Sequence, residues 1–168
     1  HKIFSISHLL LPGIIAFAVF VFGLSFLRND IDALENGADR GFKEAQYDLG
    51  EMYENGRGVP QDYGKAVEWY EKAAAQGDAA AQLNLGEMYE NGRGVPQDYG
   101  KAVEWYEKAA AQGNAGAQLS LGMMYANGFG VPKDYGKAVE LYEKAAAQGN
   151  AEAQVKYALS FWLQDYGK

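Results

Sequence analysis

Residues 81–116 read AQLNLGEMYENGRGVPQDYGKAVEWYEKAAAQGNAG, and they are one copy of a 36-residue unit. Residues 45–80 are a second copy that differs from it at four positions, and residues 117–152 are a third that differs at seven. A fourth copy starts at Ala153 and extends, incompletely, to Lys168. Self-similarity at a fixed period of this size is typical of repeat arrays, in which each unit packs against its neighbours.

Each copy has the pattern of two helices joined by a loop. In the copy of residues 81–116, the apolar residues of the first helix recur at helical spacing: Ala81, Leu85, Met88 and Tyr89. Two glycines and a proline in Asn91–Pro96 end that helix. The second helix has its own apolar face, made of Ala102, Trp105, Tyr106, Ala109 and Ala110. Asp98 is placed to cap this second helix, and Asn114 to cap the helix that follows.

A glycine lies inside the first helix of three copies. It occurs as Gly50, Gly86 and Gly122, while the fourth copy has Ala158. A glycine within a helix costs about 1 kcal/mol relative to alanine, so its repetition requires a structural reason. We expect the two helices of a unit to approach each other closely at this position.

The repeated residues resemble a known family. The pattern AxAQxxLGxMYxxGxGVPxDYxKAxxWYxKAAxQG is similar to the Sel1-like repeat, a 36-residue relative of the tetratricopeptide repeat. The resemblance covers residues 45–152, and is partial from Ala153, where LSFWLQDYGK lacks the GxGVP loop. It implies an all-α, right-handed α-solenoid of antiparallel helix pairs and a role as adaptor or scaffold in protein complexes. The family has no shared catalytic residues, so the resemblance implies none here. A cysteine-rich branch of the family has been linked to β-lactam handling, but this chain has none of those cysteines.

The pattern divides the chain into six parts. The expected boundaries are 1–28 for a hydrophobic helix, 29–44 for a degenerate capping helix, 45–80, 81–116 and 117–152 for three repeats, and 153–168 for a partial fourth. The capping helix is expected because Ala33–Gly41 aligns with Trp69–Gly77, one period later. Terminal repeats are usually atypical, since one of their sides has no neighbouring repeat.

Composition argues against several classes of function. The net charge of −7 argues against nucleic-acid binding, which needs a basic surface to meet phosphate. The chain has no cysteine, and its two histidines, His1 and His8, precede the repeats. The repeats therefore lack imidazole and thiolate groups for catalysis or metal binding. We expect no cofactor and no metal, and no small-molecule substrate is indicated.

Leu9–Leu27 is a stretch of nineteen uncharged residues, LLLPGIIAFAVFVFGLSFL. As a helix it would be about 28 Å long, close to the thickness of the hydrocarbon core of a membrane. It is compatible with a membrane anchor, and also with a cleaved signal peptide, because Gly23 and Ser25 supply small residues for cleavage. Either interpretation predicts that the repeats are exported, on the periplasmic side or in the cell envelope.

Two local patterns could suggest chemistry, but simpler interpretations are favoured. Gly56-Arg57-Gly58 lacks the following Lys and Ser or Thr that a phosphate-binding loop requires, so we interpret it as a turn between helices. The carboxylate pairs Glu51/Glu54 and Glu87/Glu90 lie three residues apart on a helix, with no histidine nearby in sequence. A solvated face is the favoured interpretation of these pairs, with binding of a cation or a basic peptide as the alternative.

The positions that differ between copies are the candidates for binding a partner. Equivalent polar positions are Asp48, Asn84, Ser120 and Lys156. Two further sets change from acidic to apolar along the array: Glu51, Glu87, Met123, Leu159, and Glu54, Glu90, Ala126, Trp162. The partner-binding candidates are Met123, Phe129, Asp48, Asn84, Ser120, Glu51 and Glu87. Neutral drift at exposed positions is the alternative explanation.

Phe129 is the most informative of these candidates. It lies in the loop between helices where the sister copies have Arg57 and Arg93, which we expect to be solvated. An aromatic residue on an exposed loop, with Met123 nearby, is the kind of side chain that dominates interfaces. The sequence thus favours a non-catalytic, membrane-tethered scaffold that binds a protein or peptide. The alternatives are a cell-envelope or resistance-related enzyme, and an assembly subunit of a larger membrane complex.

The hydrophobic segment yields a first prediction. If Leu9–Leu27 is an anchor, the expressed chain should stay in the membrane fraction during an alkaline carbonate wash, because nineteen apolar residues can span the bilayer. Immunoblotting of the two fractions measures this. Recovery of a soluble product whose N-terminus lies near Phe26 would show instead that the segment is a cleaved signal.

Overall fold

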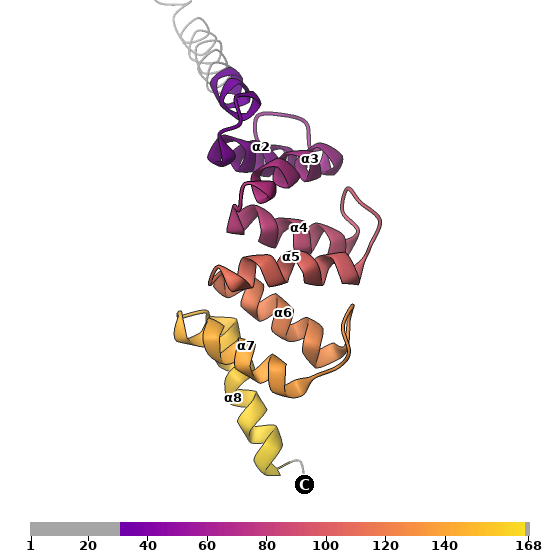
Figure 1. The fold of residues 1–168 in the computed structure, drawn as a ribbon, viewed down its shortest axis with the longest axis vertical. Helices are drawn as coiled ribbons and strands as arrows, with labels where there is room; N and C mark the ends of the chain where they lie inside the picture. The colour runs from indigo at the N-terminus through magenta and orange to yellow at the C-terminus, as the bar shows by residue number, and fades with distance from the viewer. Residues whose placement is uncertain (1–30, 167–168) are drawn as a thin grey trace, which may run out of the picture.

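A computed structural model describes residues 31–166, with the side chains of residues 31–162. This part of the chain is helical, with turns between the helices and no strand. Residues 31–39 form a helix, and the helices that follow are α2 (Lys43–Asn55), α3 (Tyr63–Ala75), α4 (Ala79–Asn91), α5 (Tyr99–Ala111), α6 (Ala115–Asn127), α7 (Tyr135–Ala147) and α8 (Ala151–Tyr166). They stack in chain order along the long axis of the molecule (Figure 1). The expected all-helical repeat solenoid is confirmed.

The predicted hydrophobic helix of residues 1–28 lies outside the described residues. Among the residues that are described, no helix is both long enough and apolar enough to cross a membrane.

Side-chain caps start the helices where the sequence places them. Asp98 caps α5 by accepting a hydrogen bond from the backbone N–H of Lys101 at 3.0 Å, and Asn114 caps α6 by accepting from Ala117 at 2.9 Å. The same caps recur in the neighbouring units, at Asp62, Asp78, Asp134 and Asn150. The starts of α3 to α7 are therefore set locally and in the same way, whereas α2 begins after Phe42 without a side-chain cap.

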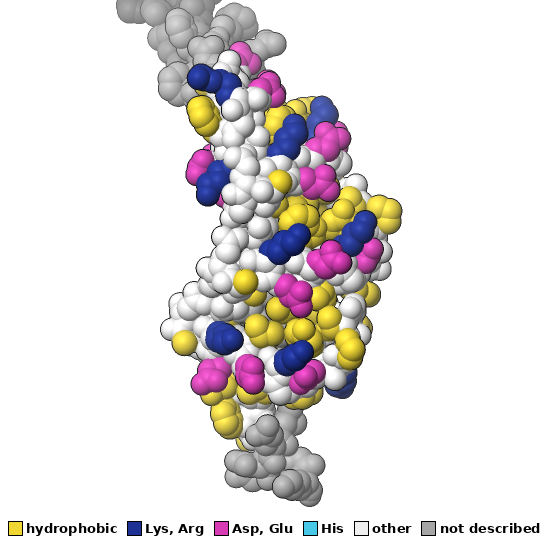
Figure 2. Space-filling model, viewed as in Figure 1, with side chains coloured by type: hydrophobic (Ala, Val, Ile, Leu, Met, Phe, Trp, Pro, Cys, Tyr) yellow, Lys and Arg dark blue, Asp and Glu magenta, His cyan; other side chains and the backbone are white. Residues whose placement is uncertain are grey.

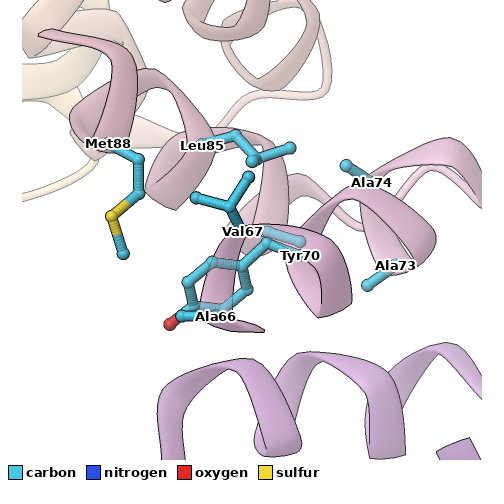
Figure 3. Packing of buried hydrophobic residues seen from close by; sticks show 8 residues of the cluster. Ala66, Val67, Tyr70, Ala73, Ala74, Leu85 and Met88 are labelled. Atoms are coloured by element: carbon cyan, nitrogen blue, oxygen red, sulfur yellow. The ribbon is translucent and has the colours of Figure 1, made fainter. Parts of the chain in front are cut away.

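The core consists of small clusters rather than one central core. In the cluster shown in Figure 3, Val67 and Tyr70 of α3 lie against Leu85 and Met88 of α4. Tyr70, Leu85 and Met88 are fully buried, as are Ala66 and Ala73. Alanines on α3 keep its backbone close to its neighbours, so that each unit buries its apolar face against the adjacent one.

The glycine inside the first helix accommodates a tyrosine ring. A Cβ atom at Gly50 would lie 2.6 Å from the Tyr70 ring, and one at Gly122 would lie 2.6 Å from the Tyr142 ring. Gly86 meets the ring of Tyr106 in the same way. The expected close approach is confirmed. The nearest contact is a tyrosine ring of the second helix against the backbone of the first, and at Gly122 the added Cβ would also lie 3.3 Å from the backbone carbonyl of Ala138.

Buried glutamines connect each unit to the one before it. Gln82 on α4 donates from Nε2 to the carbonyl of Ala74 at the end of α3, at 3.2 Å. Its Oε1 accepts a hydrogen bond of 2.8 Å from Gln112, at the end of α5. Gln46 and Gln118 make the corresponding bonds in their units. Gln46 bonds to Ala38, which joins the helix of residues 31–39 to α2 in the same manner.

The glycine contact yields a second prediction. Gly86→Ala should destabilise the protein by about 1–3 kcal/mol, because the new methyl group overlaps the buried ring of Tyr106. Urea denaturation followed by circular dichroism measures the free energy of unfolding.

Gly116→Ala is the matched control, since Gly116 also lies in a helix and the first copy has Ala80 at the equivalent position. Its added Cβ would meet the flexible end of Leu83, at 3.0 Å, and Oδ1 of Asn114, at 3.3 Å. This control should be neutral or stabilising, because alanine is the better helix former. Equal stability of Gly86→Ala and the parent would contradict the explanation given for the repeated glycine.

Candidate protein-interaction surface

The candidate residues lie where one unit meets the next. Each junction combines the first helix of a unit, its second helix, and the first helix and loop of the following unit. The first junction is formed by α2, α3 and α4, the second by α4, α5 and α6, and the third by α6, α7 and α8. We describe the junctions in this order.

A tyrosine of the second helix is central to each junction. At the first junction the hydroxyl of Tyr70 donates to the carboxylate of Glu54 at 2.7 Å, and at the second Tyr106 donates to Glu90. Both tyrosines are fully buried. Burial, together with the neighbouring carboxylate, raises the pKa of each tyrosine well above its ordinary value. Both hydroxyls therefore remain protonated donors at neutral pH.

The polar candidates of the next unit face these tyrosines. Asn84 on α4 lies beside Tyr70 and Tyr47, and Ser120 on α6 lies beside Tyr106. Asp48, the equivalent residue on α2, instead faces Leu34 of the preceding helix across a pocket of about 440 Å³. Burial is the main cause that raises the pKa of Asp48, and the charge of Glu51 adds to it. Asn84 and Ser120 thus lie beside equivalent tyrosines, whereas Asp48 lines a pocket.

The acidic candidates are only partly solvated. Glu51 accepts a hydrogen bond from Tyr47 at 3.2 Å and pairs with Arg57 at 3.4 Å. Burial and the Glu51 carboxylate raise the pKa of Tyr47 to about 12. Glu87 lies 4.0 Å from Arg93, which also pairs with Glu54. The interpretation of these carboxylates as a solvated face is therefore incomplete: Glu51 and Glu87 pair within their own units, and Glu54 pairs with Arg93 of the next unit.

The expectation that Arg93 is solvated is wrong. Its side chain extends back to the preceding unit, where it lies 3.3 Å from Glu54 and above the ring of Tyr63, at 5.7 Å. Its Nε atom is buried without a hydrogen-bond partner. The loop can lie this close because Gly94, which has a positive φ of 73°, contacts the carbonyl of Tyr63. Arg57, by contrast, has a side chain that is 65% exposed, as expected.

Phe129 replaces Arg93 in the third copy and makes an equivalent contact. Its ring stacks on Tyr99 of the preceding unit, with centroids 5.0 Å apart and an angle of 14° between the ring planes. Even so, 44% of Phe129 remains exposed. Met123 lies in a different contact, against the buried cluster that includes Leu119 and Tyr142. Phe129 therefore combines packing between units with an accessible aromatic surface.

The described surface is mixed in charge and polarity. Within residues 31–162, no group of three or more histidine, aspartate or glutamate side chains is arranged to hold a metal ion. On the face shown in Figure 2, acidic and basic side chains are interspersed with hydrophobic ones, and no basic stripe is visible. Sequence reasoning missed the contacts of Tyr70 with Glu54 and of Gln82 with Gln112. The available signals were the spacing of 30 residues between two glutamines, which every complete copy has, and the spacing of 16 residues between a glutamate and a tyrosine, which the first two copies have.

Comparison with known proteins agrees with this architecture. The Sel1 repeat model matches residues 43–78, 79–114 and 115–150. No curated protein matches the chain.

Three solved structures are similar. One is c5321, described as a protective antigen present in uropathogenic Escherichia coli strains and displaying an SLR fold, with 47% identity and a TM-score of 0.76 over 78% of this chain. The chain spans only 28% of that antigen. A Sel1 repeat protein from Oxalobacter formigenes has 44% identity and a TM-score of 0.71, over 77% of this chain and 97% of its own. Cysteine rich protein B of Helicobacter pylori has 25% identity and a TM-score of 0.60, over 77% of this chain and 93% of its own.

Glu87 yields a third prediction. Burial is the main cause that raises its pKa above the ordinary 4.5; Arg93 opposes the shift, and Glu54 and Glu90 add to it. The folded protein favours the protonated form of Glu87. Its contribution to the free energy of unfolding is therefore complete at pH values below the ordinary pKa, and is lost as the pH rises through the raised pKa. Glu87→Gln should therefore stabilise the protein at pH 7, by less than about 1 kcal/mol because solvent screens this half-exposed side chain.

Thermal melts of the variant and the parent between pH 4 and pH 7 test this sign. The difference between the two proteins should shrink as the pH falls. Glu51→Gln serves as a control for removing a nearby surface carboxylate. A Glu87→Gln variant that is less stable than the parent at pH 7 would show that the pair with Arg93 outweighs the cost of burial.

Proposed function

Because the chain belongs to the Sel1 repeat family, we propose that it is a non-catalytic scaffold that binds a protein partner at the second and third junctions. Proteins built from Sel1 repeats generally mediate protein–protein interactions, and the fold is a typical non-catalytic scaffold. We propose in addition where on this chain the partner binds.

The observation that supports this surface is the exposed aromatic ring of Phe129. Its stacking on Tyr99 holds the ring in place, so little side-chain freedom remains to be lost on binding. Rigid aromatic side chains that keep exposed area are typical binding anchors. Met123 extends the apolar character along α6, where the first two units carry carboxylates at the equivalent positions.

We also propose that the repeats are exported and attached to a membrane through Leu9–Leu27. The support is the sequence of this segment, which is uncharged over its whole length. The partner would then be a protein of the cell envelope. Asp48, Asn84 and Ser120, with Glu51 and Glu87, would act mainly by setting the shape of the junctions rather than by contacting the partner.

Phe129→Arg yields a fourth prediction. The substitution restores the residue of the sister copies, and Glu90 is available to pair with it as Glu54 pairs with Arg93. The melting temperature should therefore stay unchanged, while partner affinity falls by about 2 kcal/mol, roughly thirtyfold. Affinity capture from detergent-solubilised membranes with the tagged full chain, followed by quantitative mass spectrometry, measures the loss.

Phe42→Arg is the matched control, because Phe42 is also an exposed aromatic, 55% accessible, but precedes the first repeat helix. It should leave capture unchanged. Equal capture by the parent and by Phe129→Arg would contradict the proposed surface. A fall in melting temperature would show that Phe129 serves packing between units instead.

A further inference from the structure

The third junction lacks a carboxylate that the first two possess. At the first junction Tyr70 donates to Glu54 at 2.7 Å, and at the second Tyr106 donates to Glu90. The equivalent pair at the third junction is Tyr142 and Ala126, so the tyrosine is kept and its acceptor is replaced by a methyl group. Tyr142 is still buried, with only 5% of its surface exposed. Its hydroxyl has no hydrogen-bond partner among the residues that the structure describes.

A cation appears at the same junction. Asn84 faces the tyrosine at the first junction and Ser120 at the second. The equivalent residue at the third junction is Lys156, which lines the same pocket as Tyr142. Lys156 is half-buried on α8 and forms no ion pair within residues 31–162. Lys133, whose equivalents in the sister copies are glutamines, adds a second positive charge near Tyr135, at 5.9 Å from the ring centroid. The third junction has therefore lost the two carboxylates that Met123 and Ala126 replace and gained two cations, Lys133 and Lys156. It has also gained one carboxylate, Glu152, where the sister copies have Ala80 and Gly116.

Tyr142 and Lys156 line a pocket of about 260 Å³. Its walls come from α6, α7 and α8, and include Met123, Ala126, Tyr135, Tyr142, Lys156 and Leu159. At the first two junctions, the loop of the following unit covers the equivalents of Tyr135: Arg93 lies above Tyr63, and Phe129 stacks on Tyr99. At the third junction α8 continues to Tyr166 without a turn at the corresponding place, and Tyr135 is 50% exposed.

We propose that this pocket binds the carboxylate side chain of an acidic peptide segment in a protein partner. The carboxylate would take the place that Glu54 and Glu90 occupy at the sister junctions, accepting a hydrogen bond from Tyr142 and pairing with Lys156. Hydrogen bonds between charged groups of this kind are about twice as strong as neutral ones. The apolar walls formed by Met123, Ala126 and Leu159 suit the methylene groups of a glutamate or aspartate side chain.

The charged residues at the pocket are Lys156, which lines it, and Glu152, which acts on Tyr142. Glu152 is exposed and makes no hydrogen bond to the tyrosine among the described residues. The proposal rests on the proposed function and deepens it, because it assigns a chemical class to the partner. It concerns the pocket between α6 and α8, whereas the Phe129 ring lies between the second and third units.

Selection of peptides on the full chain tests the proposal. A random dodecapeptide display library is panned against the chain in a mild non-ionic detergent, and the enriched peptides are synthesised with a fluorophore. We expect each to contain an essential acidic residue. Replacing that residue by its amide should weaken binding by roughly tenfold to a hundredfold in fluorescence anisotropy, the range for a hydrogen bond to a charged group.

Ala126→Glu is the decisive variant. It supplies the sister carboxylate within the chain, so it should compete with the peptide and abolish binding, while Tyr142 gains an acceptor and the melting temperature does not fall. Lys156→Asn, which restores a sister residue, should also weaken binding. Ala147→Glu is the matched control, because it adds the same charge at an exposed position on α7. It should leave peptide affinity unchanged.

The possible outcomes separate the two proposals. Enriched peptides that bind Ala126→Glu as well as the parent would overturn the pocket and leave the proposed function standing. Absence of any enriched peptide would also overturn the pocket, and the capture experiment with Phe129→Arg would decide the proposed function independently.

Discussion

The contact between a tyrosine ring and a helix glycine is the constraint on which the rest of the structure depends. In each complete unit the ring lies directly against the backbone of the first helix, as Tyr106 does at Gly86. A side chain at the glycine would push the second helix away. Because the ring is fixed there, its hydroxyl reaches the carboxylate 16 residues earlier and faces the first helix of the next unit. One packing contact therefore determines both the geometry within a unit and the polar chemistry of the junction.

Contacts between adjacent units then build the array without a central core. Gln82 bonds to the end of the preceding unit and accepts from the end of its own. The loop that follows the first helix also reaches back, through Gly94 and Arg93, to Tyr63. Since these contacts join nearest neighbours, the stability of such an array is approximately a sum of unit and interface contributions. A change in one junction leaves the other junctions largely intact, which permits near-identical units to differ locally.

Much of the fold was predictable because its signals are local and repeated. The 36-residue period, the caps at Asp98 and Asn114, and the close approach at Gly86 all follow from residues near one another in sequence. Arg93 was misinterpreted for the opposite reason. An arginine between two glycines is typical of an exposed loop, so the local pattern indicates a solvated side chain. The partner that contradicts this, Glu54, lies in the preceding copy. The pocket beside Tyr142 was equally hidden, since it arises from a missing acceptor at Ala126 together with a new cation on α8.

The change from acidic to apolar residues along the array follows from this dependence between neighbours. Glu87 and Arg93 lie on the same unit, and the third copy replaces both, by Met123 and Phe129. Replacing the arginine alone would leave a partly buried carboxylate without its counter-ion, which is costly. Replacing both exchanges an ion pair for apolar surface without changing the net charge.

Glu90 can remain after this exchange because Tyr106 still donates a hydrogen bond to it. In the third copy, Ala126 stands where the sister copies have this carboxylate, so the buried Tyr142 has lost its acceptor. Lys156 lines the same pocket as Tyr142. The junctions, rather than the units, are thus where this chain differs from a uniform repeat and where selectivity for a partner can arise.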